Sequence, residues 1–355
     1  MLERRVAPSP LMAVLSPVIA VALTILAGFA LFAALGKDPV KAMEIYFLSP
    51  FADAYNRSEL LVKAIPLALI GSGLAICFRA GVFNIGAPGQ YTLGAIFAGG
   101  VALHAPEGAP MIWLLPLCLG AGFVGGMLWG WIPAILRVST GANVILVSLM
   151  LTYVAQLLLD WLVRGAWADP LAFGFPKTAT FPDGALMPIL LPGTRLHWGV
   201  VVAVVAALLL AWMLARTRRG FGIRAMGLAP KAASFAGFSE AGTITYVMLV
   251  SGGLAGLAGA VEVTSTLQQL QPDIAAGYGF AAIIVAFLGR LNPLGALVAA
   301  LALAVTYIGG ENAQILLKLP KNAAFVFQGM LLFFLLACDT LIHYRLRLRR
   351  ATGAT

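Results

Sequence analysis

Residues 216–239 read RTRRGFGIRAMGLAPKAASFAGFS and separate two long apolar runs. This stretch holds five of the 23 lysine and arginine residues of the chain. Loops rich in lysine and arginine stay on the cytoplasmic side of a membrane. The stretch therefore predicts a cytoplasmic loop between two membrane spans. Its central part, GLAPKAASFAGFS, predicts one short amphipathic helix, which is a plausible docking surface for a cytosolic partner.

The composition indicates a membrane protein. Hydrophobic residues make up 61% of the 355 residues and charged residues 10%, whereas soluble domains carry about 25% charged residues. We expect an all-α polytopic protein that forms a single transmembrane domain over residues 1–355. The charged residues lie between apolar runs, so the net charge of +9 indicates membrane topology rather than nucleic-acid binding. Cys77, Cys118 and Cys338 fall inside apolar runs and are interpreted as small core residues.

About ten transmembrane helices are expected, since a spanning helix needs roughly 20 apolar residues. The apolar run near the N-terminus is too long for the core of a signal peptide and is interpreted as a retained first helix. The candidate spans are 11–35, 60–79, 88–104, 111–136, 142–163, 197–215, 244–263, 278–290, 293–310 and 323–342.

The distribution of basic residues predicts the orientation of these spans. With the N-terminus inside, 14 of the 23 lysine and arginine residues fall at inner ends and loops, as the positive-inside rule requires. Both termini are then cytoplasmic, and residues 216–243 form a cytoplasmic coupling loop. Residues 165–196 contain five prolines and several glycines, so they predict an ordered external loop.

Small residues recur at spacings that favour close helix packing in lipid. Gly122, Gly126 and Gly130 form a double GxxxG pattern, and Gly252 and Gly256 form another. We interpret both as contacts within the chain.

Two polar breaks interrupt the apolar pattern. Residues 79–94, RAGVFNIGAPGQYTLG, place Asn84 and Gln90 among glycines and a proline. Irregular backbone at membrane depth is tolerated where it is buried in protein or lines a water-filled cavity. The break predicts either a binding segment for a neutral, polar solute or a tight turn at the cytoplasmic face. The second break, 264–280, carries Gln268 and Gln269, which are added to the candidate solute path.

The sequence lacks an energy source of its own. No phosphate-binding G-x-x-x-x-G-K-[ST] motif occurs, and no carboxylate lies near the centre of a candidate span, where ion coupling usually needs one. We predict no catalytic residues, no metal site and no cofactor in this chain. His104, His197 and His343 lie at span ends and are interpreted as interfacial. A separate motor docked on the basic loop is the expected source of energy.

Three motifs resemble one known family. Residues 78–95, FRAGVFNIGAPGQYTLGA, are similar to a segment of bacterial ABC-importer permeases with a GxFNIGxEGQ pattern. Residues 223–239, IRAMGLAPKAASFAGFS, resemble the cytoplasmic coupling loop of those permeases, and residues 277–297, GYGFAAIIVAFLGRLNPLGAL, resemble a later segment. The family is the branched-chain amino acid, ribose and nucleoside permease superfamily, and the resemblance is to its nucleoside and simple-sugar branch.

The resemblance implies roles for particular residues. It suggests that Phe83, Asn84, Gly86 and Gln90 lie near the translocation path. It places six residues in the coupling helix: Arg224, Gly227, Pro230, Lys231, Ala232 and Gly237.

The chain departs from the family pattern at three places. Ala87–Pro88 stands where the family commonly has a glutamate in second place, Ala229 replaces a usual asparagine, and Asn143–Val144 replaces a usual pair ending in glutamate.

By this resemblance the chain is the permease subunit of an ABC importer for nucleosides or related simple sugars in the bacterial cytoplasmic membrane. The implied partners are a cytosolic ATPase that binds ATP and Mg²⁺, an extracytoplasmic substrate-binding protein or lipoprotein, a second permease chain that is identical or paralogous, and membrane lipid. One alternative is an ion-coupled secondary transporter of a small polar solute. Another is a polytopic membrane enzyme, which would need clustered catalytic groups at one membrane face.

Overall fold

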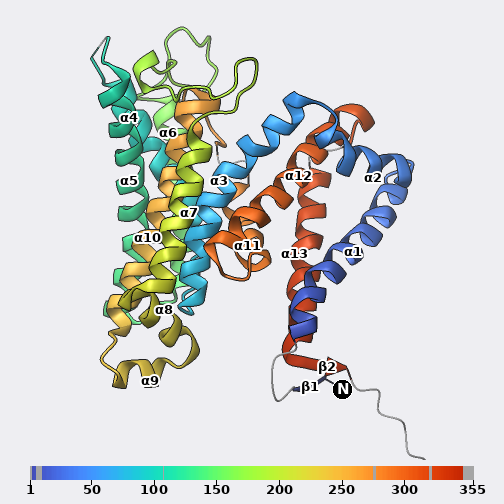
Figure 1. The fold of residues 1–355 in the computed structure, drawn as a ribbon. Helices are drawn as coiled ribbons and strands as arrows, with labels where there is room; N and C mark the ends of the chain where they lie inside the picture. The colour runs from blue at the N-terminus through green and yellow to red at the C-terminus, as the bar shows by residue number, and fades with distance from the viewer. Residues whose placement is uncertain (1, 5–9, 107, 275–276, 320–321, 347–355) are drawn as a thin grey trace, which may run out of the picture. The chain divides into compact units, whose positions relative to one another are not determined.

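The computed structural model describes residues 2–4, 10–106, 108–274, 277–319 and 322–346 and is almost entirely helical (Figure 1). The α-helices are α1 (Pro10–Ala34), α2 (Pro39–Leu48), α3 (Ala54–Arg79), α4 (Ala87–Leu103), α5 (Met111–Thr140), α6 (Val144–Arg164), α7 (Gly199–Arg216), α8 (Arg218–Leu228), α9 (Pro230–Phe235), α10 (Glu240–Glu262), α11 (Tyr278–Leu288), α12 (Pro293–Leu317) and α13 (Asn322–His343). Shorter elements are the 3-10 turns η1 (Ser49–Phe51) and η2 (Asp183–Ala185), the π-helical turn η3 (Val263–Leu267), and the strands β1 (Leu2–Arg4) and β2 (Tyr344–Leu346).

The chain divides into two compact units. The first combines Met1–Asn56 with Val305–Thr355. In this unit α1 packs against α13, and Phe32, Tyr46 and Phe327 lie in a buried apolar cluster. Strand β1 pairs antiparallel with β2, so the two described ends of the chain lie together. The cytoplasmic location of both termini stays a prediction.

The second unit, Arg57–Ala304, is a helix bundle with α4 at its centre. Helix α4 contacts α5, α6 and α10, and most of its residues are buried. Helix α3 is also buried along nearly its whole length. The first polar break joins these two buried helices, and Asn84, Gly86 and Gln90 within it are buried.

Helices α5 and α10 pack through their glycine stripes, as the GxxxG spacing predicts. A Cβ built on Gly252 would lie 2.5 Å from the carbonyl oxygen of Gly126, and one on Gly256 would lie 2.7 Å from the Cα of Gly126. Real Cβ atoms do not approach so closely, so the two backbones touch because neither helix carries a side chain there. The interpretation of these motifs as contacts within the chain is confirmed.

A helix lies at each of the ten apolar segments expected from the sequence. Within the described residues, six helices are long and apolar enough to cross a membrane: α3, α5, α6, α7, α10 with η3, and α12. The total of ten crossings stays a prediction. Helix α2 is a short element that the hydropathy pattern does not reveal, and Asp38 caps its start by accepting a hydrogen bond from the N–H of Val40 at 2.9 Å.

The loop between α6 and α7 and the basic loop lie at opposite ends of the bundle (Figure 1). The first, residues 165–198, is irregular apart from η2, as its prolines predict. It is tied to the bundle by Arg195, which donates from Nε to Oε1 of the buried Glu59 at 2.9 Å. Asp160 and Arg164, one helical turn apart, form an ion pair at 2.8 Å where α6 ends.

The interpretation of His197 as an interfacial side chain is wrong. The residue is buried, and its Nδ1 accepts a hydrogen bond from the N–H of Gly199 at 3.2 Å. Burial lowers the pKa of His197 to about 4 because a charged imidazolium loses its hydration there. His197 therefore helps to set where α7 begins.

Candidate functional site: the first break and the coupling helices

The first break is an ordered turn between two buried helices. Helix α3 ends at Arg79, Gly81 adopts a left-handed conformation with φ of 76°, and α4 begins at Ala87. Pro88 lies in the first turn of α4, where a missing N–H costs nothing. Glycine is favoured at Gly81 because other L-residues are strained at this φ.

Asn84 and Gln90 exchange hydrogen bonds inside this turn. Asn84 Nδ2 donates to Gln90 Oε1 at 2.8 Å, and Gln90 Nε2 donates to Asn84 Oδ1 at 3.1 Å. Asn84 also accepts from the N–H of Gly86 at 3.0 Å and donates to Ser251 Oγ at 3.1 Å. Asn84 and Gln90 are at most 1% exposed, so the two amides satisfy each other in this conformation and do not face a cavity.

Ser251 was missed by the sequence analysis. It lies on α10, 167 positions from Asn84, and nothing in the local pattern links the two residues. The hydrogen bond joins the first break to the glycine-lined contact between α5 and α10. Gly86 belongs to the same compact region, because a Cβ on it would lie 2.7 Å from the Cβ of Ser148 on α6.

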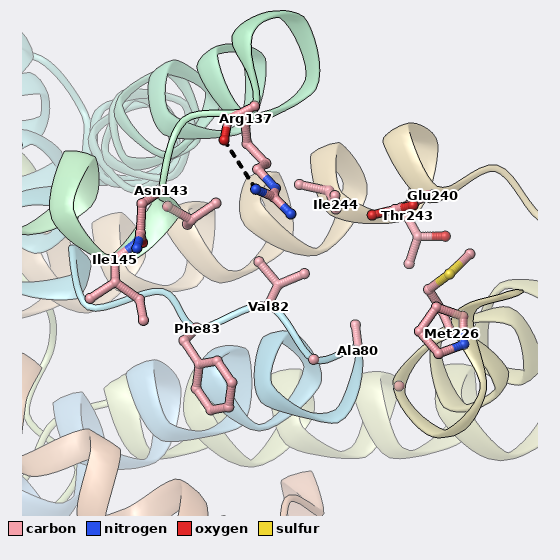
Figure 2. A pocket seen from close by; sticks show the side chains of 15 residues that line it. Ala80, Val82, Phe83, Arg137, Asn143, Ile145, Met226, Glu240, Thr243 and Ile244 are labelled. Carbon is pink, nitrogen blue, oxygen red and sulfur yellow. Dashed lines mark hydrogen bonds between the residues drawn. The ribbon is translucent and has the colours of Figure 1, made fainter.

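A cavity of about 550 Å³ lies beside this turn (Figure 2). Phe83 from the first break, Arg137 from the last turn of α5, Asn143 at the start of α6 and Met226 from α8 surround it. Phe83 is 43% exposed. Arg137 donates from Nη1 to the carbonyl oxygen of Gly141 at 3.1 Å, which holds the guanidinium at the cavity edge.

The central part of the basic loop forms the short helix α9, as expected, and a further short helix, α8, precedes it. Helix α8 ends at Leu228 and α9 starts at Pro230. Ala229 between them has φ of −150° and ψ of 76°, because proline disfavours the helical conformation in the residue before it. Thr217 and Ser239 bound the loop as helix caps, accepting hydrogen bonds from Gly220 and Gly242 at 3.1 Å.

Helix α8 contacts the first break directly. A Cβ on Gly227 would collide with the carbonyl oxygen of Arg79, the last residue of α3. Gly227 and Pro230 also line the cavity beside Phe83. The structure therefore brings part of the expected coupling set together with the first break. Arg224 is partly buried, whereas Lys231, Ala232 and Gly237 are exposed.

Helix α9 and its flanks present apolar side chains to solvent. Leu228 is 88% exposed and Phe235 is 95% exposed. Both lie outside the membrane-length helices, next to the exposed Lys231. Exposed apolar residues rimmed by charge are typical of a protein interaction site.

The glutamines of the second break lie at the other end of α4. Gln268 adopts a left-handed conformation with φ of 58°, and its carbonyl oxygen accepts a hydrogen bond from the N–H of Phe181 in the α6–α7 loop at 2.9 Å. Leu270 packs near Gly99, toward the end of α4. Gln268 and Gln269 are thus not brought together with Asn84 and Gln90.

The later residues of the second break lie close to the first break and the start of α4. Tyr91 donates from its hydroxyl to the carbonyl oxygen of Ile274 at 3.4 Å. A Cβ on Gly279 would lie 2.5 Å from the ring of Pro88. The residues after the glutamines, rather than the glutamines themselves, join the two breaks along α4.

Comparison with known proteins identifies the family. Residues 56–336 match the family of permease components of branched-chain amino acid transport systems. The chain is similar to a glucose ABC transporter permease protein of Haloferax volcanii, with 35% identity over 93% of this chain and 89% of that protein. It is 31% identical to a nucleoside ABC transporter permease protein of Lactococcus lactis, over 84% of each chain. A guanosine ABC transporter permease protein of Bacillus subtilis is 30% identical over 90% of this chain and 92% of its own length.

These matches extend over the bundle, both breaks and the coupling helices. The family consists of transport permeases rather than catalytic enzymes, which agrees with a chain of membrane-length helices. The chain belongs to the membrane permease family of branched-chain amino acid transport systems.

Proposed function

We propose that the chain is the permease subunit of a bacterial ABC importer that carries nucleosides or related simple sugars across the cytoplasmic membrane. The observation that carries this proposal is the contact between α8 and the first break, since Gly227 touches the backbone of Arg79. A partner that moves the coupling helices would move the start of α4 as well. The names of the relatives, which include glucose, nucleoside and guanosine permeases, support the solute class.

The partner on the coupling helices is a cytosolic ATPase in this proposal. The exposed Leu228 and Phe235 offer apolar contact area, and Lys231 offers a charge beside them. The coupling residues are those expected from the sequence: Arg224, Gly227, Pro230, Lys231, Ala232 and Gly237. ATP and Mg²⁺ bind to the partner.

The other partners follow from the opposite end of the bundle and from the relatives. A substrate-binding protein docks on residues 165–196, which lie away from the coupling helices. A second permease chain completes the transporter. The relatives include two nucleoside permeases from Lactococcus lactis that match this chain separately, which favours two different permeases in one transporter.

The solute path in this proposal passes the first break and the second break, at Phe83, Asn84, Gly86, Gln90, Gln268 and Gln269. The hydrogen-bonded pair of Asn84 and Gln90 represents a closed state of the first break. Displacement of α8 would free the Asn84 and Gln90 amides, which offer both donors and acceptors to a polar solute.

The ion-coupled alternative finds less support. The carboxylates of the six membrane-length helices, such as Glu59 and Glu262, lie toward the helix ends. Ion coupling usually relies on an ionisable group near the midplane, and the family match favours a component of a larger transport system.

Reconstituted uptake tests the proposal. The chain, its second permease and the ATPase would be placed in proteoliposomes with the substrate-binding protein, and uptake of radiolabelled guanosine and glucose would be measured. We expect concentrative uptake that requires ATP on the side of the membrane where the ATPase is bound. Ionophores should leave this uptake unchanged. Concentrative uptake by the permease chains without the ATPase, or uptake abolished by ionophores alone, would refute it.

A further inference from the structure

Helix α6 carries a polar stripe along one face. Tyr153, Gln156 and Asp160 follow one another at spacings of three and four residues, which places them on the same side of the helix. Arg164 continues the stripe through its ion pair with Asp160. The helix is nevertheless one of the six that are long and apolar enough to cross a membrane.

The stripe lines a cavity whose opposite wall comes from residues of the two breaks. Side chains from α6 and Thr92 of α4 face Pro272, Asp273 and Ile274 across a space of about 330 Å³. This volume lies within the range of small-molecule sites, roughly 300–1,000 Å³. We call this cavity the α6 groove.

The floor of the α6 groove is held in place. The carbonyl oxygen of Ile274 accepts the hydrogen bond from Tyr91, so the later part of the second break is fixed to α4. Asp273 adopts a left-handed conformation with φ of 65°. Non-glycine residues in this region are uncommon and cluster at functional sites.

Lipid is an unfavourable neighbour for the α6 groove. Polar side chains within a membrane are costly and usually face the interior of a bundle or a water-filled cavity. Tyr153 and Gln156 lie near the middle of α6. The α6 groove therefore faces water or a partner chain, whereas Asn84 and Gln90 satisfy each other inside the protein.

We propose that the α6 groove binds the sugar moiety of the transported solute through its vicinal hydroxyl groups. Carboxylates such as Asp160 and Asp273 accept hydrogen bonds from two neighbouring hydroxyls, and the Gln156 amide both donates and accepts. The Tyr153 ring offers a flat apolar surface for the carbon face of a sugar or for a base. This inference rests on the proposed function and adds solute contacts on α6, a helix that the sequence motifs do not include.

Cysteine labelling tests whether the α6 groove is open to water. Gln156→Cys and Val154→Cys would be compared in the assembled transporter with a charged, membrane-impermeant methanethiosulfonate. Val154 is 49% exposed on the side of α6 away from the stripe, and the native Cys77, Cys118 and Cys338 are buried. Aqueous access predicts labelling of Gln156→Cys at least about tenfold faster, since charged reagents are excluded from hydrocarbon.

Saturating guanosine or glucose should slow that labelling several-fold. Equal labelling rates at the two positions would overturn the inference, and so would labelling of Gln156→Cys that neither solute slows while both are taken up.

Substrate analogues test recognition of the hydroxyl groups. ATP-driven uptake of guanosine and of 2′,3′-dideoxyguanosine would be measured for the unmodified transporter and for Gln156→Leu and Asp273→Asn. The rate of guanosine uptake divided by that of 2′,3′-dideoxyguanosine uptake should fall by about tenfold or more in the variants. A site built to bind a hydroxyl group rejects analogues that lack it, and the variants lose this discrimination. Every measurement uses the same substrate-binding protein, so its own preference between guanosine and the analogue is the same for all the transporters compared.

Matched controls lie outside the α6 groove. Gln314→Leu changes an exposed glutamine of another membrane-length helix, and Glu44→Gln changes an exposed glutamate of α2. Both should keep the unmodified ratio. A ratio that stays unchanged in Gln156→Leu and Asp273→Asn would overturn the inference even though uptake continues. Absence of ATP-driven uptake of guanosine and glucose by the unmodified transporter would instead refute the proposed function, and the labelling comparison can still be made.

Discussion

Asn84 and Gln90 occupy the first break for a reason that the local sequence only partly reveals. Two amides among glycines predicted polar chemistry at membrane depth, and the structure places both side chains in one hydrogen-bonded pair. Their pairing and the bond to Ser251 depend on the packing of α10, which no local pattern encodes. The residue types could therefore be predicted, whereas their closed arrangement could not.

Asn84→Leu should destabilise the chain and change transport. Leucine would leave Gln90, Ser251 and the N–H of Gly86 without the partner they have now, and each buried unsatisfied group costs about 1–3 kcal/mol. We expect a lower thermal midpoint in detergent and an altered uptake rate or apparent affinity. Asn56→Leu, at a half-buried residue in an exposed hydrogen-bonded pair with Asp53, should shift the midpoint little. An unchanged midpoint and substrate profile for Asn84→Leu would contradict this role.

His197 predicts a pH dependence of stability. Its pKa is about 4 in the folded chain and 6.5 when exposed, so the unfolded state binds the proton more readily. The neutral side chain stabilises the fold above pH 6.5, and this contribution, about 3 kcal/mol at 1.36 kcal/mol per pKa unit, is lost as the pH falls from about 6.5 to about 4.

The thermal midpoint in detergent, measured across that pH range, checks this expectation. His197→Gln cannot titrate, so its midpoint should fall less steeply than that of the unmodified chain. Parallel pH profiles for the two proteins would show that His197 does not contribute.

At the scale of elements, the glycine stripes are the feature that sequence spacing predicted best. Both stripes meet across the contact of α5 and α10, where the backbones touch. Gly126→Val would force an isopropyl group between α5 and α10, and overpacking typically costs about 1–3 kcal/mol. We expect a lower thermal midpoint and a lower yield of folded protein. Gly120 lies on the same helix, and a Cβ built on it would have nothing within 4 Å, so Gly120→Val should behave like the unmodified chain. Equal thermal midpoints for the two variants would argue against close packing at the glycine stripes.

The structure of the coupling loop could be predicted from the sequence only in part. Its charge and one short helix at its centre were predicted, whereas α8 was not, and the contact of Gly227 with Arg79 arises only in the fold. Similarly, α2 is hidden because a ten-residue helix leaves no span-length hydropathy signal. Short elements depend on tertiary packing more than on their own sequence.

Gly227→Val should uncouple ATP hydrolysis from transport. The added side chain would push α8 away from the end of α3, so movement of the ATPase would no longer reach the first break. We expect uptake to fall by about tenfold, about 1.4 kcal/mol of lost coupling, while the ATPase still co-purifies. Gly242→Ala in the first turn of α10 meets only ordinary contacts at 3.4 Å and serves as the control. Normal uptake by Gly227→Val would remove this contact from the mechanism.

At the scale of the molecule, the sequence predicted a helical membrane protein whose two ends lie on one side, and β1 and β2 do pair. The α6–α7 loop and the coupling helices lie at opposite ends of the second unit. The central claim is that the coupling helices face the cytoplasm and are held there by a separate ATPase.

Cross-linking between the coupling helices and the ATPase tests that claim most directly. Phe235→Cys, at a side chain that is 95% exposed, would be treated with a thiol-to-amine cross-linker in inside-out vesicles that contain the whole transporter. The account predicts a cross-linked product of this chain with the ATPase and no labelling of Phe235→Cys by impermeant maleimide in right-side-out vesicles. Labelling from the outside, with no cross-link to the ATPase, would contradict it.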